Sequence, residues 1–181
     1  DKLIHPYDDS PLDRESVGET VYLEIINRAA DYVYIFTPYL ILDDFMRTAV
    51  CNAAKRGVDV RIVTPGIPDK KTVFRLTRSN YAPLLKAGVK IYEYTPGFIH
   101  AKSMVCDDKC AVVGSINLDY RSLYLHFENA VYFSGCSAVT DVKRDGEGVF
   151  ARSRQISIED TKQGFFGRLV DSVLRVFETL L

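Results

Sequence analysis

Apolar side chains recur every three to four residues in some stretches of the chain and every second residue in others. The first spacing is typical of amphipathic helices and the second of half-buried strands, so their alternation predicts an α/β fold. In the first half of the chain, the pattern predicts helices at about 16–30, 43–56 and 71–87, and strands at about 32–37, 58–64 and 89–94.

Capping residues mark the ends of these predicted helices. Ser16 and Glu19 have the spacing of a capping box at the start of the first helix. Gly57 and Gly88 stand where the second and third helices should end. The face of the second helix that we expect to be buried carries Phe45, Ala49, Val50 and Ala53.

Beyond Gly97 the helical pattern stops, and strands are predicted close together at about 99–106, 111–113 and 128–133. The short connection at 107–109 predicts a hairpin. A hairpin joins antiparallel strands, whereas strand–helix–strand units join parallel ones. The whole pattern therefore predicts a mixed β-sheet flanked by helices on both faces.

The last segment, 159–181, again has apolar residues at helical spacing. These residues are Phe165, Phe166, Leu169, Val173, Val176, Phe177 and Leu180. We therefore divide the chain into a main domain at 1–158 and a C-terminal amphipathic helix at 159–181. Such a helix either packs on the domain or lies on a membrane surface.

Composition limits the class of protein. The 181 residues are 47% hydrophobic and 26% charged with a formal net charge of -1, which excludes an intrinsically disordered chain and fits one compact domain. The longest apolar run, 32–42, is interrupted by Thr37 and Pro38 and is shorter than the ~20 residues that a bilayer requires. The chain starts at Asp1 without a visible signal peptide, so we expect a piece of a longer protein.

Charge is distributed unevenly along the chain. Residues 1–44 hold 3 basic and 10 acidic side chains, whereas residues 55–90 hold nine basic and two acidic ones. Such a basic block attracts phosphates, anionic lipids or nucleic acid, or it forms the solvated faces of two helices. The sequence leaves both interpretations open.

The four cysteines form no CxxC pair, so we expect reduced and mostly buried thiols. They are Cys51, Cys106, Cys110 and Cys136. A metal site built from His100, Asp107 and two of these cysteines matches no compact zinc spacing, and we expect no metal or other cofactor. We assign no catalytic role to His126 or to His5, which lies in an N-terminus that we expect to be loose.

The clearest chemistry lies at 100–107, where His100, Lys102 and Asp107 have the spacing H-x-K-x4-D. On a strand, residues two apart share a face, so the His100 imidazole and the Lys102 ammonium should point the same way while Ala101 packs behind them. This arrangement would place a nucleophile or an acid beside a fixed positive charge.

Three further polar residues follow. Ser115 and Asn117 lie two apart at a predicted strand end, where a hydroxyl and an amide can bond phosphate oxygens. Glu128 opens an apolar strand, in which an unpaired carboxylate is costly. One partner would explain it, because a carboxylate on the far nitrogen of the His100 imidazole orients the ring.

Together these residues resemble one copy of the HKD motif of the phospholipase D superfamily. Within that superfamily, the chain resembles the C-terminal half of bacterial cardiolipin synthases, and the likeness covers nearly the whole chain. The stretches that carry it are 9–12, 36–40, 67–70, 91–102 and 116–123. The resemblance implies the phospholipase D-like α/β/α sandwich.

The resemblance also implies phosphatidyl transfer through a phosphohistidine, in which two phosphatidylglycerol molecules give cardiolipin and glycerol. Fixed cationic donors would stabilise the charge of the transition state without a metal. The implied roles are nucleophile or general acid and base for His100, phosphate binding for Lys102, Ser115 and Asn117, orientation of His100 for Glu128, and the local turn for Asp107.

Enzymes of this family use two HKD copies, and this chain holds one. The second copy should come from a missing N-terminal region, in which case this chain alone would be inactive or feeble, or from a homodimer mate. The full-length protein would act on phospholipid at the cytoplasmic face of the cell membrane, while this piece alone would be soluble. We expect no nucleic acid as a partner.

Other functions stay open at this point. A homodimeric phosphodiesterase or nuclease would suit the basic block, although the apolar stretch at 92–98 and the amphipathic tail suit a lipid better. Phosphatidylserine synthesis would differ only in the acceptor alcohol. A non-catalytic lipid-surface module is the third alternative, and the combination of His100, Lys102, Asn117 and Glu128 argues against it.

Overall fold

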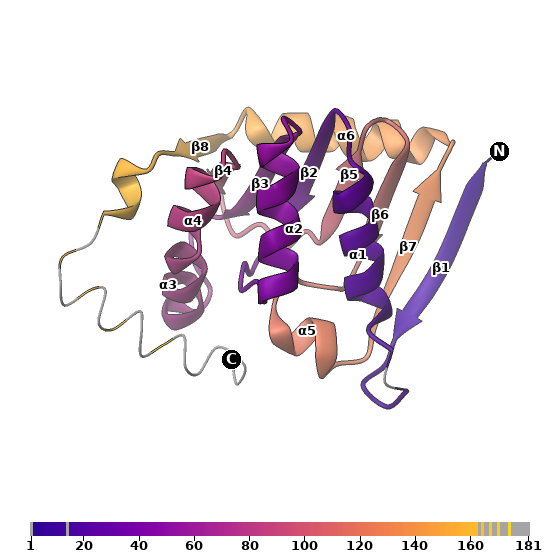
Figure 1. The fold of residues 1–181 in the computed structure, drawn as a ribbon, viewed down its shortest axis with the longest axis horizontal. Coiled ribbons are helices and arrows are strands. Elements are labelled where there is room, and N and C mark those ends of the chain that lie inside the picture. Colours follow the sequence, from indigo (N-terminus) through magenta and orange to yellow (C-terminus); the bar gives the residue numbers. More distant parts are fainter. Residues whose placement is uncertain are drawn as a thin grey trace.

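The computed structural model describes residues 2–13, 15–162, 164, 167, 170 and 174. Within these residues, eight strands form one sheet in the order β1-β7-β6-β5-β2-β3-β4-β8 (Figure 1). The strands are β1 (Leu3–Asp9), β2 (Tyr32–Phe36), β3 (Asp59–Pro65), β4 (Lys90–Tyr94), β5 (Ser103–Cys106), β6 (Cys110–Gly114), β7 (Glu128–Ser134) and β8 (Ser153–Ile156). The helices are α1 (Val17–Arg28), α2 (Asp44–Lys55), α3 (Lys71–Ser79), α4 (Tyr81–Lys86), α5 (Tyr120–Tyr124) and α6 (Ser137–Phe150), followed by a 3-10 turn at Glu159–Thr161.

The sheet is mixed, as the sequence predicts. Strands β2, β3 and β4 are parallel to one another, because α2 and then α3 with α4 connect them. The predicted hairpin joins β5 to β6, and β5 lies antiparallel to β2. Strands β7 and β1 continue the antiparallel half, and β8 pairs antiparallel with β4 at the other edge.

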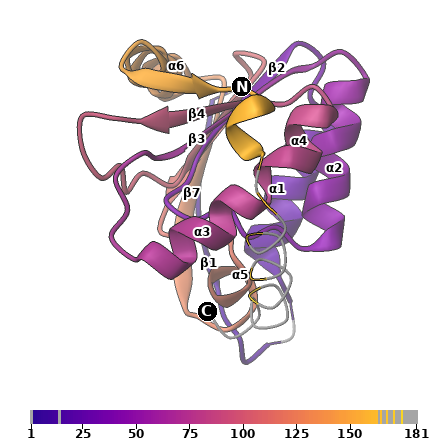
Figure 2. The ribbon, with the colours of Figure 1, turned by 90° about the vertical axis from the view of Figure 1, so that its left-hand side faces the viewer.

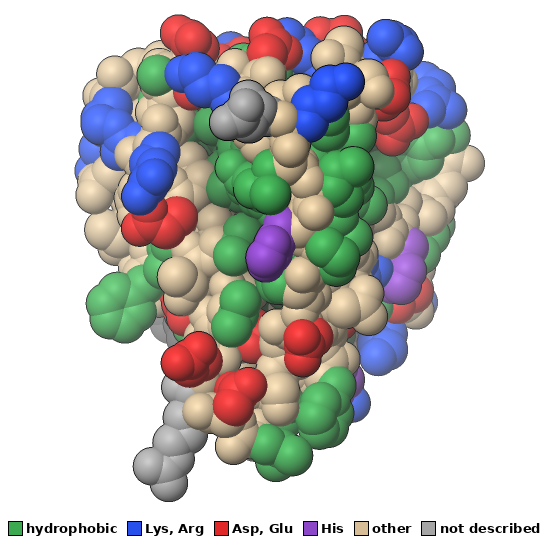
Figure 3. All heavy atoms as spheres, turned by 90° about the vertical axis from the view of Figure 1, so that its right-hand side faces the viewer, with side chains coloured by type: hydrophobic (Ala, Val, Ile, Leu, Met, Phe, Trp, Pro, Cys, Tyr) green, Lys and Arg blue, Asp and Glu red, His purple; other side chains and the backbone are tan. Residues whose placement is uncertain are grey.

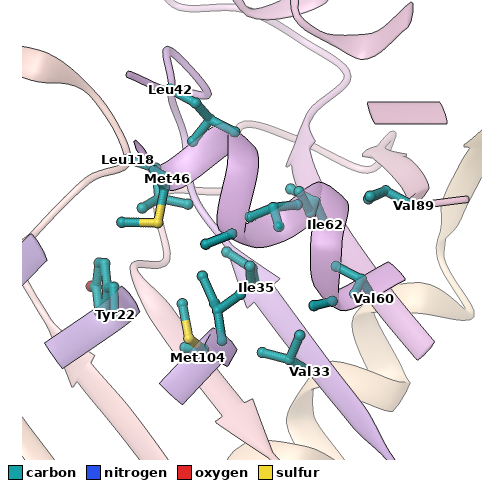
Figure 4. Close-up of a cluster of buried hydrophobic side chains, with 14 of the residues drawn as sticks. Tyr22, Val33, Ile35, Leu42, Met46, Val60, Ile62, Val89, Met104 and Leu118 are labelled. Carbon is teal, nitrogen blue, oxygen red and sulfur yellow. The ribbon is translucent and has the colours of Figure 1, made fainter. Parts of the chain in front are cut away.

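Helices cover both faces of the sheet. Helices α1, α2 and α4 pack on one face and α6 lies across the other (Figure 2). Under α1 and α2, the core is built around residues such as Tyr22, Ile35 and Met46 (Figure 4). Under α6, Tyr34 and Phe36 pack against Phe150 with ring centroids 5.1 and 5.5 Å apart. These layers confirm the α/β/α expectation.

The N-terminal segment, which we expected to be loose, is strand β1. It pairs with β7 over seven residues, from Leu3 opposite Ser134 to Asp9 opposite Glu128, and His5 lies within it. Figure 3 looks at this edge of the sheet, where hydrophobic side chains gather. The expectation was wrong because the partner strand lies more than a hundred residues away and leaves no local signal.

The first helix begins without the predicted capping box. The Ser16 side chain makes no capping hydrogen bond. Instead, the Asp9 carboxylate accepts hydrogen bonds from the backbone N–H of Val17 at 3.2 Å and of Gly18 at 2.8 Å. The N-terminus of α1 is therefore fixed by the strand that precedes it.

The buried face of α2 differs from the prediction at one position. Asp43 caps this helix by accepting a hydrogen bond from the Met46 N–H at 2.7 Å. The helical phase that follows places Met46 inside, with none of its surface exposed, and leaves Phe45 75% exposed. Ala49, Val50 and Ala53 are buried as expected.

The helix predicted at 71–87 is split into α3 and α4 at Asn80. There the Ser79 hydroxyl and the Asn80 amide both donate to the Leu76 carbonyl, at 2.8 and 3.1 Å, and Pro83 offers no N–H to continue the helical pattern. Gly57 and Gly88 end their helices with positive φ, as predicted. The apolar residues of the helix predicted at 159–181 lie outside the described residues.

Candidate active site

The HKD segment lies at the edge of the sheet where the parallel strands β2, β3 and β4 end. Residues 98–102 form no regular secondary structure, and β5 starts only at Ser103. His100 is exposed, and its ring stacks on Phe98 with centroids 5.6 Å apart. Lys102 follows with its Nζ donating to the His100 carbonyl at 2.8 Å. The prediction that Ala101 packs behind them is wrong, because residue 101 precedes the strand and is exposed.

Charge and burial together adjust the titration of this pair. Partial burial lowers the pKa of His100, and the nearby Lys102 charge lowers it further, while Asp69 acts in the opposite direction. Burial also lowers the pKa of Lys102, against the attraction of Glu128 and Asp119. A lowered pKa keeps the His100 ring neutral at pH 7, and a neutral ring is the form that can attack phosphorus or accept a proton.

Glu128 is half-buried and lies beside two serine hydroxyls. Ser115 Oγ donates to Glu128 Oε2, and Ser122 Oγ donates to Glu128 Oε1 at 2.7 Å. In the part of the chain that the structure describes, Glu128 makes no hydrogen bond to His100. The reason is the strand order, since β7, which starts at Glu128, is separated from β5 by β6. The Glu128 carboxylate therefore has hydrogen-bond partners in the fold but does not contact the His100 imidazole.

A close approach between β6 and β7 positions Ser115. A Cβ on Gly114 would lie 2.4 Å from both Ala130 Cβ and the Asn129 carbonyl oxygen, so only glycine fits. The Ser115 N–H donates to the Asn129 carbonyl at 2.8 Å, and Ser115 Oγ accepts from the Asn129 N–H at 3.0 Å. These bonds fix Ser115 just past the end of β6.

Asn117 lies in the loop that leads into α5. Its N–H donates to Ser122 Oγ at 2.9 Å, and the next residue, Leu118, donates its N–H to Thr37 Oγ1 at 3.2 Å. The loop is thereby drawn back to the end of β2. Among the described residues, Asn117 Oδ1 is a buried oxygen without a hydrogen-bond partner. This oxygen can accept a hydrogen bond from a ligand, whereas the side-chain hydrogen bond of Asn117 to the Asp119 carboxylate would have to break before the amide nitrogen could donate to a phosphate oxygen.

Asp107, the aspartate of the HKD motif, lies at the opposite end of β5 from His100 and Lys102. Its carboxylate accepts hydrogen bonds from the N–H groups of Ala30, Asp31 and Tyr32 at 2.8, 2.9 and 2.8 Å. Burial raises the pKa of this carboxyl, but the three backbone donors outweigh burial and hold the pKa below its usual range. The structure therefore separates Asp107 from His100 and places it at a structural junction.

Part of the basic block at 55–90 is ion-paired or hydrogen-bonded within the fold. Arg61 and Lys90 both pair with Asp59, at 2.6 and 2.8 Å. Arg78 pairs with Glu93 at 2.9 Å, and Arg56 donates to the last carbonyls of α1. These contacts reduce the positive charge of the block, and Arg61 and Lys90 lie on strands β3 and β4 rather than on the two helices that the sequence suggested.

A hollow of about 230 Å³ opens beside Asn117. Lys70, Arg121 and His126 line it, together with the apolar or aromatic Tyr39, Ile41 and Val73 and the polar Asp119 and Ser122. Sequence reasoning gave none of these side chains a role, although 67–70 and 116–123 were among the stretches that carried the resemblance. Their proximity depends on three separate loops and has no signature in sequence spacing.

The remaining features concern groups outside this site. Among the described residues, no cluster of His, Cys, Asp and Glu could hold a metal ion, and no helix has the length and hydrophobicity to span a bilayer. The four cysteines are free. Only Cys106 is buried and the other three are half-buried, so the expectation of mostly buried thiols was too strong.

Comparison with known protein sequences agrees with the resemblance to cardiolipin synthases. Residues 22–147 match the family model described as cardiolipin synthase, PLD-like domain. The cardiolipin synthase of Alkalihalophilus pseudofirmus is 39% identical over 172 residues, which cover 94% of this chain and 34% of that protein. The chain spans about a third of the length of the curated relatives it matches.

Solved structures agree at the level of the fold. The phosphatidylserine synthase of Haemophilus influenzae superposes with a TM-score of 0.81 at 12% identity, covering 99% of this chain and 48% of that one. Nuc of Salmonella typhimurium, a phospholipase D family member, superposes with a TM-score of 0.73 at 17% identity, covering 86% of this chain and 99% of that one.

Proposed function

Because this chain belongs to the family of cardiolipin synthase PLD-like domains, we propose that it supplies one of two HKD half-sites of a phosphatidyltransferase. The reaction proposed is the synthesis of cardiolipin from two phosphatidylglycerol molecules. The observation that carries the proposal is the placement of an exposed His100 beside Lys102 at the sheet edge where Ser115 and Asn117 also lie. The second half-site comes from another part of a longer protein.

The proposed reaction has two displacements at phosphorus. In the first, a histidine nitrogen attacks the phosphodiester of one phosphatidylglycerol, the N–P bond forms, and glycerol leaves with a proton from the second histidine. In the second, a hydroxyl of another phosphatidylglycerol gives its proton to that histidine and attacks phosphorus, and the N–P bond breaks. His100 takes one of these two roles. Its lowered pKa favours the neutral ring that the nucleophile needs, whereas the second histidine must be protonated before glycerol leaves.

The other site residues act on the phosphate oxygens in this proposal. The Lys102 ammonium and the Asn117 amide stabilise the negative charge that develops on the equatorial oxygens. Ser115 assists them and is held by Glu128. For Glu128 to orient His100, as the resemblance implies, the ring would have to move toward β7 when the second half-site completes the centre. In this proposal, Asp107 has a structural role and does not contact the substrate.

The proposed place of action is a membrane surface, since both substrates are lipids, and the family resemblance implies its cytoplasmic face. Large apolar side chains are exposed next to the HKD segment, among them Ile67 at 50% and Phe98 at 37%. Apolar groups in this position favour contact with lipid over contact with a polyanion.

A homodimeric phosphodiesterase is the second candidate. One observation favours it, because the fold of this chain covers 99% of the Nuc chain, so the fold can form a whole protein chain. In that case two copies of His100 would face each other across a two-fold axis. Phosphatidylserine synthesis would use the same site with serine as the acceptor.

A turnover assay on vesicles tests these alternatives. We expect phosphatidylglycerol to be converted to cardiolipin by this chain joined to its second half-site, and we expect His100→Ala to lower the rate by roughly a thousandfold or more. His5→Ala, a histidine substitution on the edge strand, serves as the matched control and should retain the rate. Light scattering on the isolated chain, with its own turnover, separates a half-site from a homodimer.

Each outcome of that assay has a defined meaning. A monomer without turnover supports the half-site, and a dimer whose turnover disappears in His100→Ala supports the homodimer. Conversion of serine in place of the second lipid, or cleavage of DNA, would assign the site to the corresponding alternative. Unchanged turnover in His100→Ala would refute the proposed mechanism.

A further inference from the structure

The hollow beside Asn117 is distinct from the place where His100 and Lys102 lie. Neither of these two residues lines it, whereas Asn117 belongs to both. Its volume of about 230 Å³ is below the roughly 300–1,000 Å³ of pockets for drug-sized ligands. The hollow is therefore of a size that suits a polar headgroup rather than a whole lipid.

Two cationic side chains line the hollow without carboxylate partners. In the part of the chain that the structure describes, Lys70 makes no ion pair. Arg121 uses Nε to donate to His126 Nε2 at 2.7 Å, which leaves its two terminal nitrogens without a described partner. Arg61, Arg78 and Lys90 of the basic block are paired with carboxylates outside this hollow, whereas unpaired cations in a concave wall attract an anion.

The acidic groups around the hollow are already engaged. Asp119, in its wall, is 7% exposed and accepts a hydrogen bond from the Ser122 N–H at 2.8 Å as the cap of α5. Asp69 accepts a hydrogen bond from Tyr39 at 2.6 Å and another from the backbone N–H of Lys70 at 2.7 Å. Lys70 and Arg121 thus share the wall of the hollow with one carboxylate, Asp119, whose hydrogen-bonding capacity is partly used within the fold.

His126 holds the Arg121 guanidinium in place. The ring accepts the Arg121 Nε–H on one nitrogen, and its Nδ1 lies 3.8 Å from Glu128 Oε1. Glu128 also accepts hydrogen bonds from the hydroxyls of Ser115 and Ser122. A continuous set of contacts therefore connects the hollow with Ser115, the serine proposed to bind phosphate. An arginine fixed on one side presents its terminal N–H groups in the planar arrangement that phosphate oxygens accept.

We propose that this hollow binds the phosphodiester of the acceptor lipid, with Lys70 and Arg121 as its cationic donors. This inference rests on the proposed function and deepens it. The acceptor in cardiolipin synthesis carries its own phosphate, so the site must hold two phosphates, one at His100 and Lys102 and one elsewhere. A headgroup anchored in the hollow extends its hydroxyl past Asn117 toward the phosphorus on histidine. The new O–P bond replaces the N–P bond, and the hydroxyl proton passes to the second histidine.

The competition between transfer and hydrolysis tests the inference in the assembly that shows turnover. We expect Arg121→Gln and Lys70→Gln to lower the ratio of cardiolipin to phosphatidic acid at least tenfold, because water then replaces the poorly held acceptor. Transfer to ethanol, an acceptor without a phosphate, should stay within twofold of the wild-type rate. Lys86→Gln, an exposed cation on α4, is the matched control.

Two results would contradict the inference in that assay. An unchanged product ratio in both variants would show that the hollow does not hold the acceptor. An equal loss of cardiolipin and of ethanol transfer would show that these cations act on the donor phosphate instead.

A binding experiment on this chain separates failure of the inference from failure of the proposed function. The probe is glycerophosphoglycerol, the soluble headgroup of phosphatidylglycerol, titrated by NMR with the His126 ring signals as readout. We expect at least tenfold weaker binding in Arg121→Gln and partial recovery in Arg121→Lys. Inorganic phosphate, titrated in parallel, should bind more weakly than the diester. Equal binding of inorganic phosphate, or unaltered binding in Arg121→Gln, would overturn the lipid assignment even if turnover were confirmed.

Discussion

Asp9 illustrates how a side chain on one element fixes the start of another. It lies eight residues before Val17, and its carboxylate receives the first two N–H groups of α1. Ser16, the nearest residue of the type that caps helices, makes no such bond. A sequence rule ranks Ser16 first because it considers only neighbours in the chain, whereas Asp9 reaches the helix through the pairing of β1 with β7.

Removal of the two candidate caps should therefore have unequal effects. We expect Asp9→Ala to lower the free energy of unfolding by about 1–2 kcal/mol, because two helical N–H groups lose their acceptor. Ser16→Ala should change it by less than about 0.5 kcal/mol, as expected for a surface site. Urea denaturation of both variants measures the difference, and an equal or larger loss in Ser16→Ala would contradict it.

The candidate site could be predicted in part at this scale. His100, Lys102 and Asp107 lie within eight residues, so their spacing alone indicated the chemistry. The neighbours of Glu128 could not be predicted, because they depend on β6 lying between β7 and β5. The same limit applies to Lys70 and Arg121, whose shared hollow is formed by loops that sequence spacing does not relate.

At the scale of elements, the apolar pattern predicted the central part of the sheet well. Strands β2, β3 and β4 and helices α1 and α2 begin and end within about two residues of the expected bounds. Helix α6 was not predicted. It contains two glycines, Gly146 and Gly148, which weaken helical propensity, and tertiary packing compensates for them.

The two glycines of α6 differ in what surrounds them. A Cβ on Gly146 would lie 2.5 Å from Phe36 Cζ, whereas a Cβ on Gly148 would meet nothing within 4 Å. We expect Gly146→Ala to destabilise the protein by about 1–3 kcal/mol through overpacking. Gly148→Ala should stabilise it by about 0.4–1 kcal/mol. Thermal unfolding of both variants tests the pair, and a shift in the same direction for both would disprove the packing argument.

At the scale of the whole molecule, Asp107 connects segments that are distant in the sequence. Its backbone belongs to the β5–β6 hairpin, and its carboxylate holds the three N–H groups where α1 passes into β2. The aspartate of the HKD motif is thus the contact through which the second half of the chain fixes the first. The mixed sheet was predictable from element types, but this junction was not, since it depends on which strands become neighbours.

The pH dependence of stability should report this junction. The pKa of Asp107 is lowered in the folded state, so its contribution is complete above the unfolded value of about 3.9 and is lost as the pH falls through the folded value. We expect Asp107→Asn to cost about 1.5–3 kcal/mol at pH 7, in the range of hydrogen bonds to a charged group. The gap between variant and wild type should narrow in urea titrations toward pH 3. A gap that stays constant would rule out the charged carboxylate as its source.

Because β1 pairs with β7, the sheet cannot be completed until β7 has been synthesised. Leu3 lies opposite Ser134, so β1 leaves the ribosome long before its partner exists. At roughly 5–20 residues per second, the delay is about 6–25 s. Throughout that interval, Leu3 and Ile4 and the backbone groups of the strand have no partner, and α1 lacks its cap from Asp9. Strand β1 is thus made before the other strands of this sheet but is among the last of them to pair, so its unpaired edge must be protected from aggregation in the nascent chain.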